Sequence, residues 1–291
     1  MIFCEISRTD RNSHWECFLQ ETMQVEKEDT KRDISPAAGI EGVWSLEQNR
    51  DLTTVAYERI EELFVAMRIA PGEDIRTQDL QVMVDLGRTP VHQAVRRLAA
   101  ETLLEIRPRN GLRVTPIDLS REKRLAELRR DLNRFVTSTA IRNMTANDRA
   151  ALYYLRRKLA AELDGLSLDA FNAIDKSFDR LVIRASGERF LDRVLSPLHA
   201  IARRIGFLHI NQISGREGIL GSAERHLAIM DFMLAGSEEK ACAASDELVA
   251  YGIAMLQQLE KEIDPALLDV RFSARAGKAA WAVRKPKPST G

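Results

Sequence analysis

The chain has 291 residues, which leaves room for two domains, and 45% of them are hydrophobic, enough to build cores. Its 43 basic and 43 acidic residues cancel, so the net charge does not identify a partner. No apolar run approaches the ~20 residues of a membrane span, no secretory signal opens the chain, and the three cysteines lack metal-ligand spacing. These features argue against a membrane partner and predict a cytoplasmic protein with reduced thiols.

The first fifty residues show no sustained periodicity and mix charges with Ser, Thr and Asn, which predicts a disordered extension over residues 1–50. Apolar residues then recur at helical spacing over residues 52–69, and this pattern stops at Pro71-Gly72. A short second helix is predicted over residues 77–84, with Thr77 as its cap.

A third helix is predicted to start at Thr89, because Thr is a favoured N-cap and Pro90 then takes the first helical position. Its predicted buried face carries Val91, Val95 and Leu98, and its exposed face carries His92, Gln93, Arg96 and Arg97. Two short strands are expected over residues 103–107 and 112–115, joined by a turn at residues 108–111.

Acidic residues are spread along the chain, whereas arginines are concentrated in this short region. The arginines of this basic cluster are Arg88, Arg96, Arg97, Arg107, Arg109 and Arg113. Three helices followed by a basic hairpin are typical of a winged helix-turn-helix domain, which we place at residues 51–117. The alternative is a solvated basic helix in a small α/β unit. The predicted contacts to double-stranded DNA are Arg88, Thr89, His92, Gln93, Arg96, Arg97, Arg109, Asn110 and Gly111.

The remainder of the chain is predicted to be a compact helical bundle over residues 119–263. Its helices are expected near residues 120–143, 146–163, 168–186, 188–212, 219–235 and 238–262. Thr145 with Asp148 resembles a capping box, and Ser167 and Ser237 are expected caps. Residues 264–291 become basic and are predicted to form a flexible tail.

The predicted domains resemble a known family. The motifs that carry the resemblance are Pro71-Gly72-Glu73, Arg88-Thr89-Pro90-Val91, Ala94-Val95-Arg96-Arg97-Leu98 and Asn110-Gly111-Leu112-Arg113-Val114. They look like the GntR family of bacterial transcription regulators, and the helical remainder is similar to the ligand-sensing FCD domain of its FadR subfamily. The implied fold is mainly α, with an N-terminal winged helix-turn-helix and a C-terminal all-helical bundle. His92 stands where the family usually has arginine, so the operator sequence is expected to differ.

Two carboxylates, Asp175 and Asp179, fall on or beside an apolar stripe of one predicted helix. Buried carboxylates must be paired, protonated or bound to a cation. The resemblance implies a metal site here: Asp175 matches the family's Asp, Asp179 stands where a His is usual, His226 matches the next His, and Leu248 replaces the last. Asp175, Asp179 and His226 would then hold a divalent ion, such as manganese or magnesium; the alternative is a metal-free polar cluster.

The resemblance also places Arg129 at a pocket arginine of FCD domains, where a guanidinium suits a carboxylate ligand. Its alternative role is a surface salt bridge. Together these features predict a dimeric repressor that binds a palindromic operator and responds to a small carboxylate effector. Alternatives are a metal-free or non-functional pocket and, remotely, a metal-dependent hydrolase. The chain has no nucleophile elbow, phosphate loop or HExxH pair, so we predict that it is not an enzyme.

Overall fold

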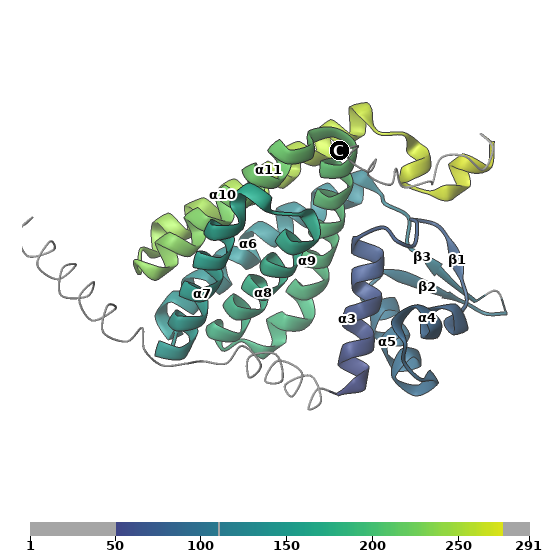
Figure 1. Cartoon of the computed structure of the whole chain (residues 1–291), viewed down its shortest axis with the longest axis horizontal. Coiled ribbons are helices and arrows are strands. Elements are labelled where there is room, and N and C mark those ends of the chain that lie inside the picture. The colour runs from purple at the N-terminus through teal and green to yellow at the C-terminus, as the bar shows by residue number, and fades with distance from the viewer. Residues whose placement is uncertain (1–50, 110, 276–291) are drawn as a thin grey trace, which may run out of the picture. The chain divides into compact units, whose positions relative to one another are not determined.

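The computed structural model describes residues 51–109 and 111–275 (Figure 1). The predicted extension over residues 1–50, Asn110 and the end of the predicted tail therefore lie outside the described residues. The described helices and strands, in chain order, are α3 (Leu52–Val65), β1 (Asp74–Ile75), α4 (Thr77–Val84), α5 (Arg88–Ala100), β2 (Leu104–Arg107), β3 (Gly111–Val114), α6 (Leu119–Asn143), α7 (Ala146–Glu162), α8 (Leu168–Ser186), α9 (Arg189–His209), α10 (Gly215–Leu234) and α11 (Glu238–Glu262). No described helix combines the length and the apolar character that crossing a bilayer requires.

The elements α3 to β3 form the winged domain, three helices beside a small antiparallel sheet (Figure 1). The strand order is β1-β3-β2, with Glu105 opposite Arg113 in the hairpin. The helices close over one apolar core, in which Ile60, Leu80 and Leu98 are fully buried. β1 was not predicted, because two residues are too short to show any alternation.

The winged domain departs from prediction at its helix starts. α5 begins at Arg88, two residues before the predicted first helical residue Pro90, and its N-cap is Gly87 rather than Thr89. Similarly, Thr77 is the first residue of α4, and Arg76 takes the N-cap position. In both cases the local sequence located the start to within two residues but misassigned the cap. The first helix also ends at Val65 rather than Ile69.

The elements α6 to α11 form the helical bundle around a second core. The capping box of Thr145 and Asp148 is confirmed, and Ser167 caps α8 through the Ala170 N–H. Ser237 holds the N-cap position of α11, but its side chain makes no capping hydrogen bond. The gap expected between the helices near residues 188–212 and 219–235 is absent, since a π-helical turn over Ile210–Ser214 leads directly into α10.

After α11 the chain returns to the winged domain. Residues 265–275 contain two short 3-10 helices, Pro265–Leu267 and Val270–Arg275, which we call the strap. The Val270 N–H donates to the Pro71 carbonyl, and a Cβ atom at Gly72 would collide with the Asp269 carboxylate. The prediction of a flexible tail from residue 264 is therefore wrong for this segment, because an apolar cluster under it anchors the strap.

The winged domain and the bundle meet along α3 and α9. Ala200 and Ile201 of α9 are part of the apolar core of the winged domain. Buried charges lie beside this contact: Glu61 on α3 pairs with Lys176 of α8 and Arg203 of α9. The two domains are therefore joined by apolar packing and by ion pairs.

Candidate functional site

The exposed face of α5 is set by its buried one. Val91, Val95 and Leu98 are at most 2% exposed, so the opposite side of the helix must face outward. Gly87 supplies no capping side chain, so the first backbone N–H groups of α5 lack a side-chain acceptor. A helix start of this kind favours an anion such as phosphate.

The predicted DNA-contacting residues of α5 divide into two groups. Gln93 accepts a hydrogen bond from the Thr53 hydroxyl at 2.6 Å, and Arg97 pairs with Glu101 at 2.9 Å while stacking over the Tyr57 ring. Both residues are therefore engaged within the winged domain. The others, Arg88, Thr89, His92 and Arg96, are exposed, and no described side chain forms a hydrogen bond or ion pair with theirs.

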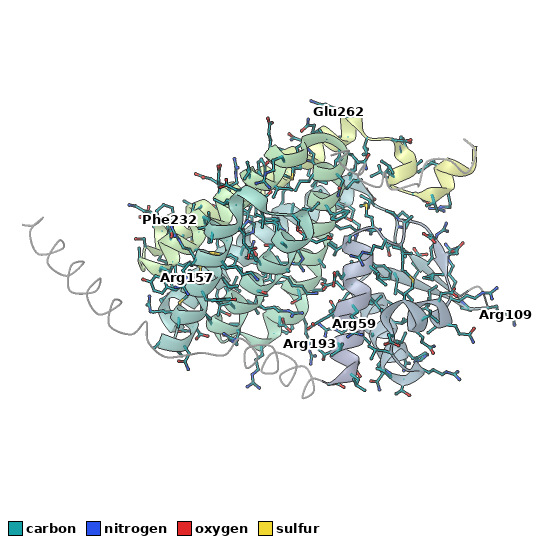
Figure 2. The ribbon with its side chains drawn as sticks, viewed as in Figure 1. Arg59, Arg109, Arg157, Arg193, Phe232 and Glu262 are labelled. Carbon is teal, nitrogen blue, oxygen red and sulfur yellow. The ribbon has the colours of Figure 1, made fainter. Side chains whose placement is uncertain are left out.

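The hairpin tip presents a further cation. Arg109 is exposed at the outer end of the hairpin (Figure 2). Arg109 and Gly111 both have positive φ angles, 68° and 84°, which the tight turn between β2 and β3 requires. A Cβ atom at Gly111 would approach the Ile75 carbonyl oxygen to 3.1 Å, so a residue without a side chain suits this position. The structure places Arg109 and Gly111 in the predicted wing, whereas Asn110 lies outside the described residues.

Two arginines of the basic cluster have internal roles instead. Arg113 is 6% exposed and donates to the Gly72 carbonyl at 3.0 Å. Arg107 lies 3.6 Å from Asp74 and 3.4 Å from Glu105, on the strands of the same sheet. Of the six arginines of this cluster, those left exposed without a described partner are thus Arg88 and Arg96 of α5 and Arg109 at the hairpin tip.

A cavity of about 100 Å³, lined by apolar side chains and by several charged ones, lies in the helical bundle. We call it the bundle cavity; α6, α8, α9, α10 and α11 all contribute to its lining. The lining residues used below are Arg129, Asn133, Asp175, Asp179, His199, Arg203, His226 and Leu248. The structure therefore brings together all the residues that the sequence predicted for this site.

Asp175 and His226 form a buried ion pair in this cavity. The His226 Nε2 atom lies 2.7 Å from the Asp175 carboxylate, and its Nδ1 atom lies 2.8 Å from the Ser222 carbonyl oxygen. Both neighbours are acceptors, so both ring nitrogens carry protons. Burial opposes charge on each group, but their attraction outweighs it: the pKa of His226 is raised and that of Asp175 is lowered.

Asp179 is turned toward α9 rather than toward His226. Its carboxylate accepts from Arg203 at 2.7 Å and lies 3.1 Å from His199 Nδ1. Arg203 also lies 3.7 Å from Asp175 and 3.6 Å from Glu61. Arg203 was not predicted from the sequence; the signal for it is an arginine pair, Arg203-Arg204, within the apolar stripe of α9.

Arg129 differs from the other charged residues of the cavity. Its Nε atom is buried and has no hydrogen-bond partner, and Arg129 forms no ion pair within the described ranges 51–109 and 111–275. Burial lowers the pKa of its guanidinium, and the carboxylates of Asp179 and Asp175 only partly offset this. Arg129 is therefore a half-buried cation that lines a cavity and has an unpaired, buried Nε donor, an arrangement suited to an anionic ligand.

Family models match both domains: a model of bacterial regulatory proteins of the gntR family matches residues 52–114, and a model of the FCD domain matches residues 124–251. The chain belongs to the GntR family. It is therefore a DNA-binding transcriptional regulator with an FCD domain, in a family whose members are not enzymes.

Individual relatives agree with this assignment. The HTH-type transcriptional repressor RspR of Escherichia coli (strain K12) is 24% identical over 164 residues, which cover 55% of this chain and 69% of RspR. The structure of E. coli McbR/YncC has a TM-score of 0.64 at 18% identity, covering 73% of this chain and all of that one. A putative GntR regulator from Rhodococcus sp. RHA1 has a TM-score of 0.54 at 15% identity, covering 71% and 97%. Both structures share the fold.

The metal site that the resemblance implied does not fit the residues of this GntR regulator. Asp179 is engaged by Arg203, and Leu248 offers no donor atom. Nowhere in the described part of the chain do three His, Cys, Asp or Glu side chains come together as a metal site would require. The guanidinium of Arg203 supplies the positive charge that Asp175 and Asp179 need, so these carboxylates do not require an ion.

Proposed function

We propose that this GntR regulator represses transcription from a palindromic operator and releases it when a small carboxylate binds in the bundle cavity. One observation carries the effector part: Arg129 lines a cavity, and its buried Nε atom has no hydrogen-bond partner in the described part of the chain. A carboxylate would give it two charge-assisted hydrogen bonds and compensate its charge. No metal ion is needed for this binding.

The DNA-binding part is supported by the exposed cations of the winged domain. In this proposal Arg96 and His92 face the base edges in the major groove, while Arg88 and the start of α5 contact phosphate. Arg109 reaches the DNA backbone or the minor groove from the hairpin tip. The name of the relative RspR includes the word repressor, which favours repression over activation here.

A homodimer is supported by an exposed apolar face on α6. Leu128 and Phe135 are each 51% exposed and are seven residues apart, so they project from the same side of the helix. Burying this face against a second copy would give a twofold-related pair of winged domains. Mass measurement by light scattering should show a dimer, and Phe135→Ser should shift it toward the monomer.

Ligand binding to Arg129 is the central test. Wild-type protein is heated with a panel of sodium carboxylates: acetate, succinate, citrate and benzoate. At a hundredfold excess over its dissociation constant, a ligand should stabilise the protein by about 2.7 kcal/mol. Arg129→Gln should abolish this shift, whereas the neighbouring Arg130→Gln should retain it. A shift that persists in Arg129→Gln would refute the proposed site.

Repression is tested on a duplex selected by the wild-type protein from a random pool. The selected sequence should contain two inverted half-sites. The carboxylate with the largest thermal shift should weaken binding to this duplex. Tighter binding in its presence would mean that the ligand acts as a corepressor, contrary to the proposal.

A further inference from the structure

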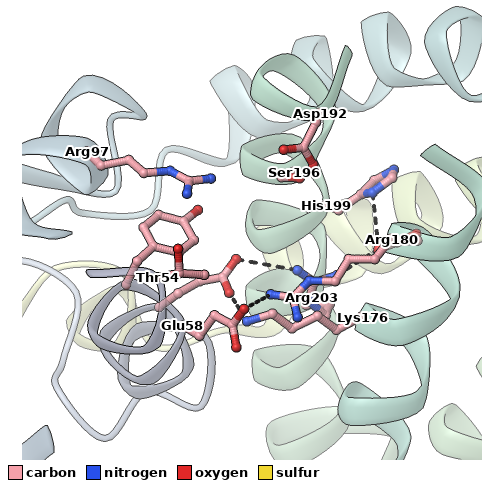
Figure 3. Close-up of a pocket in the computed structure, with 12 residues that line it drawn as sticks. Thr54, Glu58, Arg97, Lys176, Arg180, Asp192, Ser196, His199 and Arg203 are labelled. Atoms are coloured by element: carbon pink, nitrogen blue, oxygen red, sulfur yellow. Dashed lines mark hydrogen bonds and ion pairs between the residues drawn. The ribbon is translucent and has the colours of Figure 1, made fainter. Parts of the chain in front are cut away.

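A second cavity, of about 200 Å³, lies between the winged domain and the bundle. We call it the interdomain cavity. Figure 3 shows Thr54 and Glu58 of α3 on one side of it, with Lys176, Arg180 and Arg203 on the other. Three residues line both this cavity and the bundle cavity: Asp179, His199 and Arg203. They form a common wall between the effector site and the winged domain.

Arg203 is the member of this wall that contacts both domains. On the bundle side it lies 2.7 Å from Asp179 and 3.7 Å from Asp175. On the other side it lies 3.6 Å from Glu61 of α3. The side chain of Arg203 is only 7% exposed and that of Glu61 only 3%, so water screens this contact weakly.

The charge balance around Arg203 is close. Three carboxylates, those of Glu61, Asp175 and Asp179, share Arg203, while Lys176 gives Glu61 a second partner and His226 gives Asp175 one. A carboxylate on Arg129 would add a negative charge to the cavity that Arg203 lines. The contact of Arg203 with Glu61 on the winged-domain side is long, at 3.6 Å, whereas its contact with Asp179 on the bundle side is short, at 2.7 Å. The Glu61 contact is therefore the one that an added anion would weaken.

A movement of α3 would reach the DNA-binding surface directly. The Thr53 hydroxyl donates to Gln93 of α5, and the Tyr57 hydroxyl donates to Glu101 just after α5. Other contacts still hold α3 to the bundle, including the ion pair between Glu58 and Arg180 at 2.8 Å. Loss of the Glu61 contact would thus loosen the winged domain without detaching it.

We infer that Arg203 couples the effector cavity to the winged domain: a carboxylate bound at Arg129 draws Arg203 away from Glu61, and the loosened winged domain binds its operator less tightly. This inference rests on the proposed carboxylate effector and assigns its coupling to one residue pair. Coupling requires that the ligand favour one of two states, here the state without the Arg203–Glu61 contact.

The test uses the full chain, the selected operator duplex and the panel carboxylate that binds wild-type protein. Operator affinity is measured by fluorescence anisotropy with and without this carboxylate, and carboxylate affinity is measured by calorimetry. In wild-type protein the carboxylate should weaken operator binding on the order of tenfold. Glu61→Gln should reduce this ratio to near one and should bind the carboxylate more tightly, because Glu61 no longer competes for Arg203.

Glu62→Gln is the matched control, since Glu62 is exposed and adjacent on α3; it should keep the wild-type ratio. If Glu61→Gln does not fold, Arg203→Lys replaces it, because the shorter side chain cannot span from Asp179 to Glu61. A wild-type ratio in a folded Glu61→Gln or Arg203→Lys protein would overturn the inference and leave the effector site intact. Absence of carboxylate binding to wild-type protein would overturn the proposed function and the inference with it.

Discussion

The winged domain and the helical bundle both depend on arginine, but in opposite settings. Arg88 and Arg96 are exposed and have no partner in the described part of the chain, whereas Arg203 is buried among three carboxylates. An exposed cation retains its hydration and is available to a polyanion, while a buried one must be compensated from within. Arg129 combines the two settings, because it is half-buried and its buried Nε atom has no partner in the described part of the chain, and this is why we assign it to a ligand.

The largest expected effect comes from removing the buried cation. Arg203→Met should lower the free energy of unfolding by about 3–5 kcal/mol, because Asp175, Asp179 and Glu61 would lose a shared partner. Arg180→Met breaks a more exposed ion pair with Glu58 and should change stability by only about 0–1 kcal/mol. Urea denaturation of both variants measures the difference. If both variants lost the same free energy of unfolding, the burial of Arg203 would not increase its contribution to stability.

The pair of Asp175 and His226 should make stability depend on pH. The pKa of His226 is raised above its usual 6.5, so its contribution is complete below this value and is lost as pH rises through the raised pKa. The pKa of Asp175 is lowered below its usual 3.8, so its contribution is present above this value and is lost as pH falls further. The pair of Asp175 and His226 therefore stabilises the folded protein most between about pH 3.8 and pH 6.5.

This window can be measured with His226→Gln, which cannot titrate. At about pH 5.5 the variant should be less stable than wild type by roughly 3 kcal/mol, and the gap should narrow at about pH 8. Denaturant unfolding at both pH values gives the comparison, and His92→Gln, on the exposed face of α5, is the control. A gap that widens toward alkaline pH would contradict the assigned ion pair.

Much of the winged domain could be predicted because its signals are local. The spacing of Val91, Val95 and Leu98 determined the buried face of α5, and the prediction of that face is confirmed. Roles that depend on distant residues could not be predicted in this way. Arg97 is held by Tyr57, forty residues away in sequence, and only the packing of α3 on α5 brings them together.

The bundle shows the same limit more strongly. The sequence predicted that Asp175 and Asp179 would be costly on an apolar face, and the structure places both in the cavity wall. It did not predict what compensates them, because Arg203 reaches them from another helix. The metal hypothesis was inferred from the family pattern, and the residues present do not fit it, because Arg203 of α9 already pairs with Asp179.

In the winged domain, the expected effects fall on DNA binding rather than on stability. Arg96→Ala should weaken binding to the selected operator by about 1–3 kcal/mol and should relax base preference at one position of each half-site. Arg157→Ala is the control, because this exposed arginine lies on α7 of the bundle (Figure 2). Unchanged operator affinity in Arg96→Ala would mean that the outer face of α5 does not enter the groove.

The smallest effect is expected at the hairpin tip. Arg109 is exposed at the tip, where it would contact the phosphate backbone without reading bases. Arg109→Ala should therefore weaken binding to operator and to random duplexes by similar factors. The slope of log affinity against log salt concentration should become shallower by about one, because one fewer counterion is released. If Arg109→Ala instead lost operator affinity alone, the wing would read sequence, and the division between a base-reading helix and a backbone-contacting wing would have to be reversed.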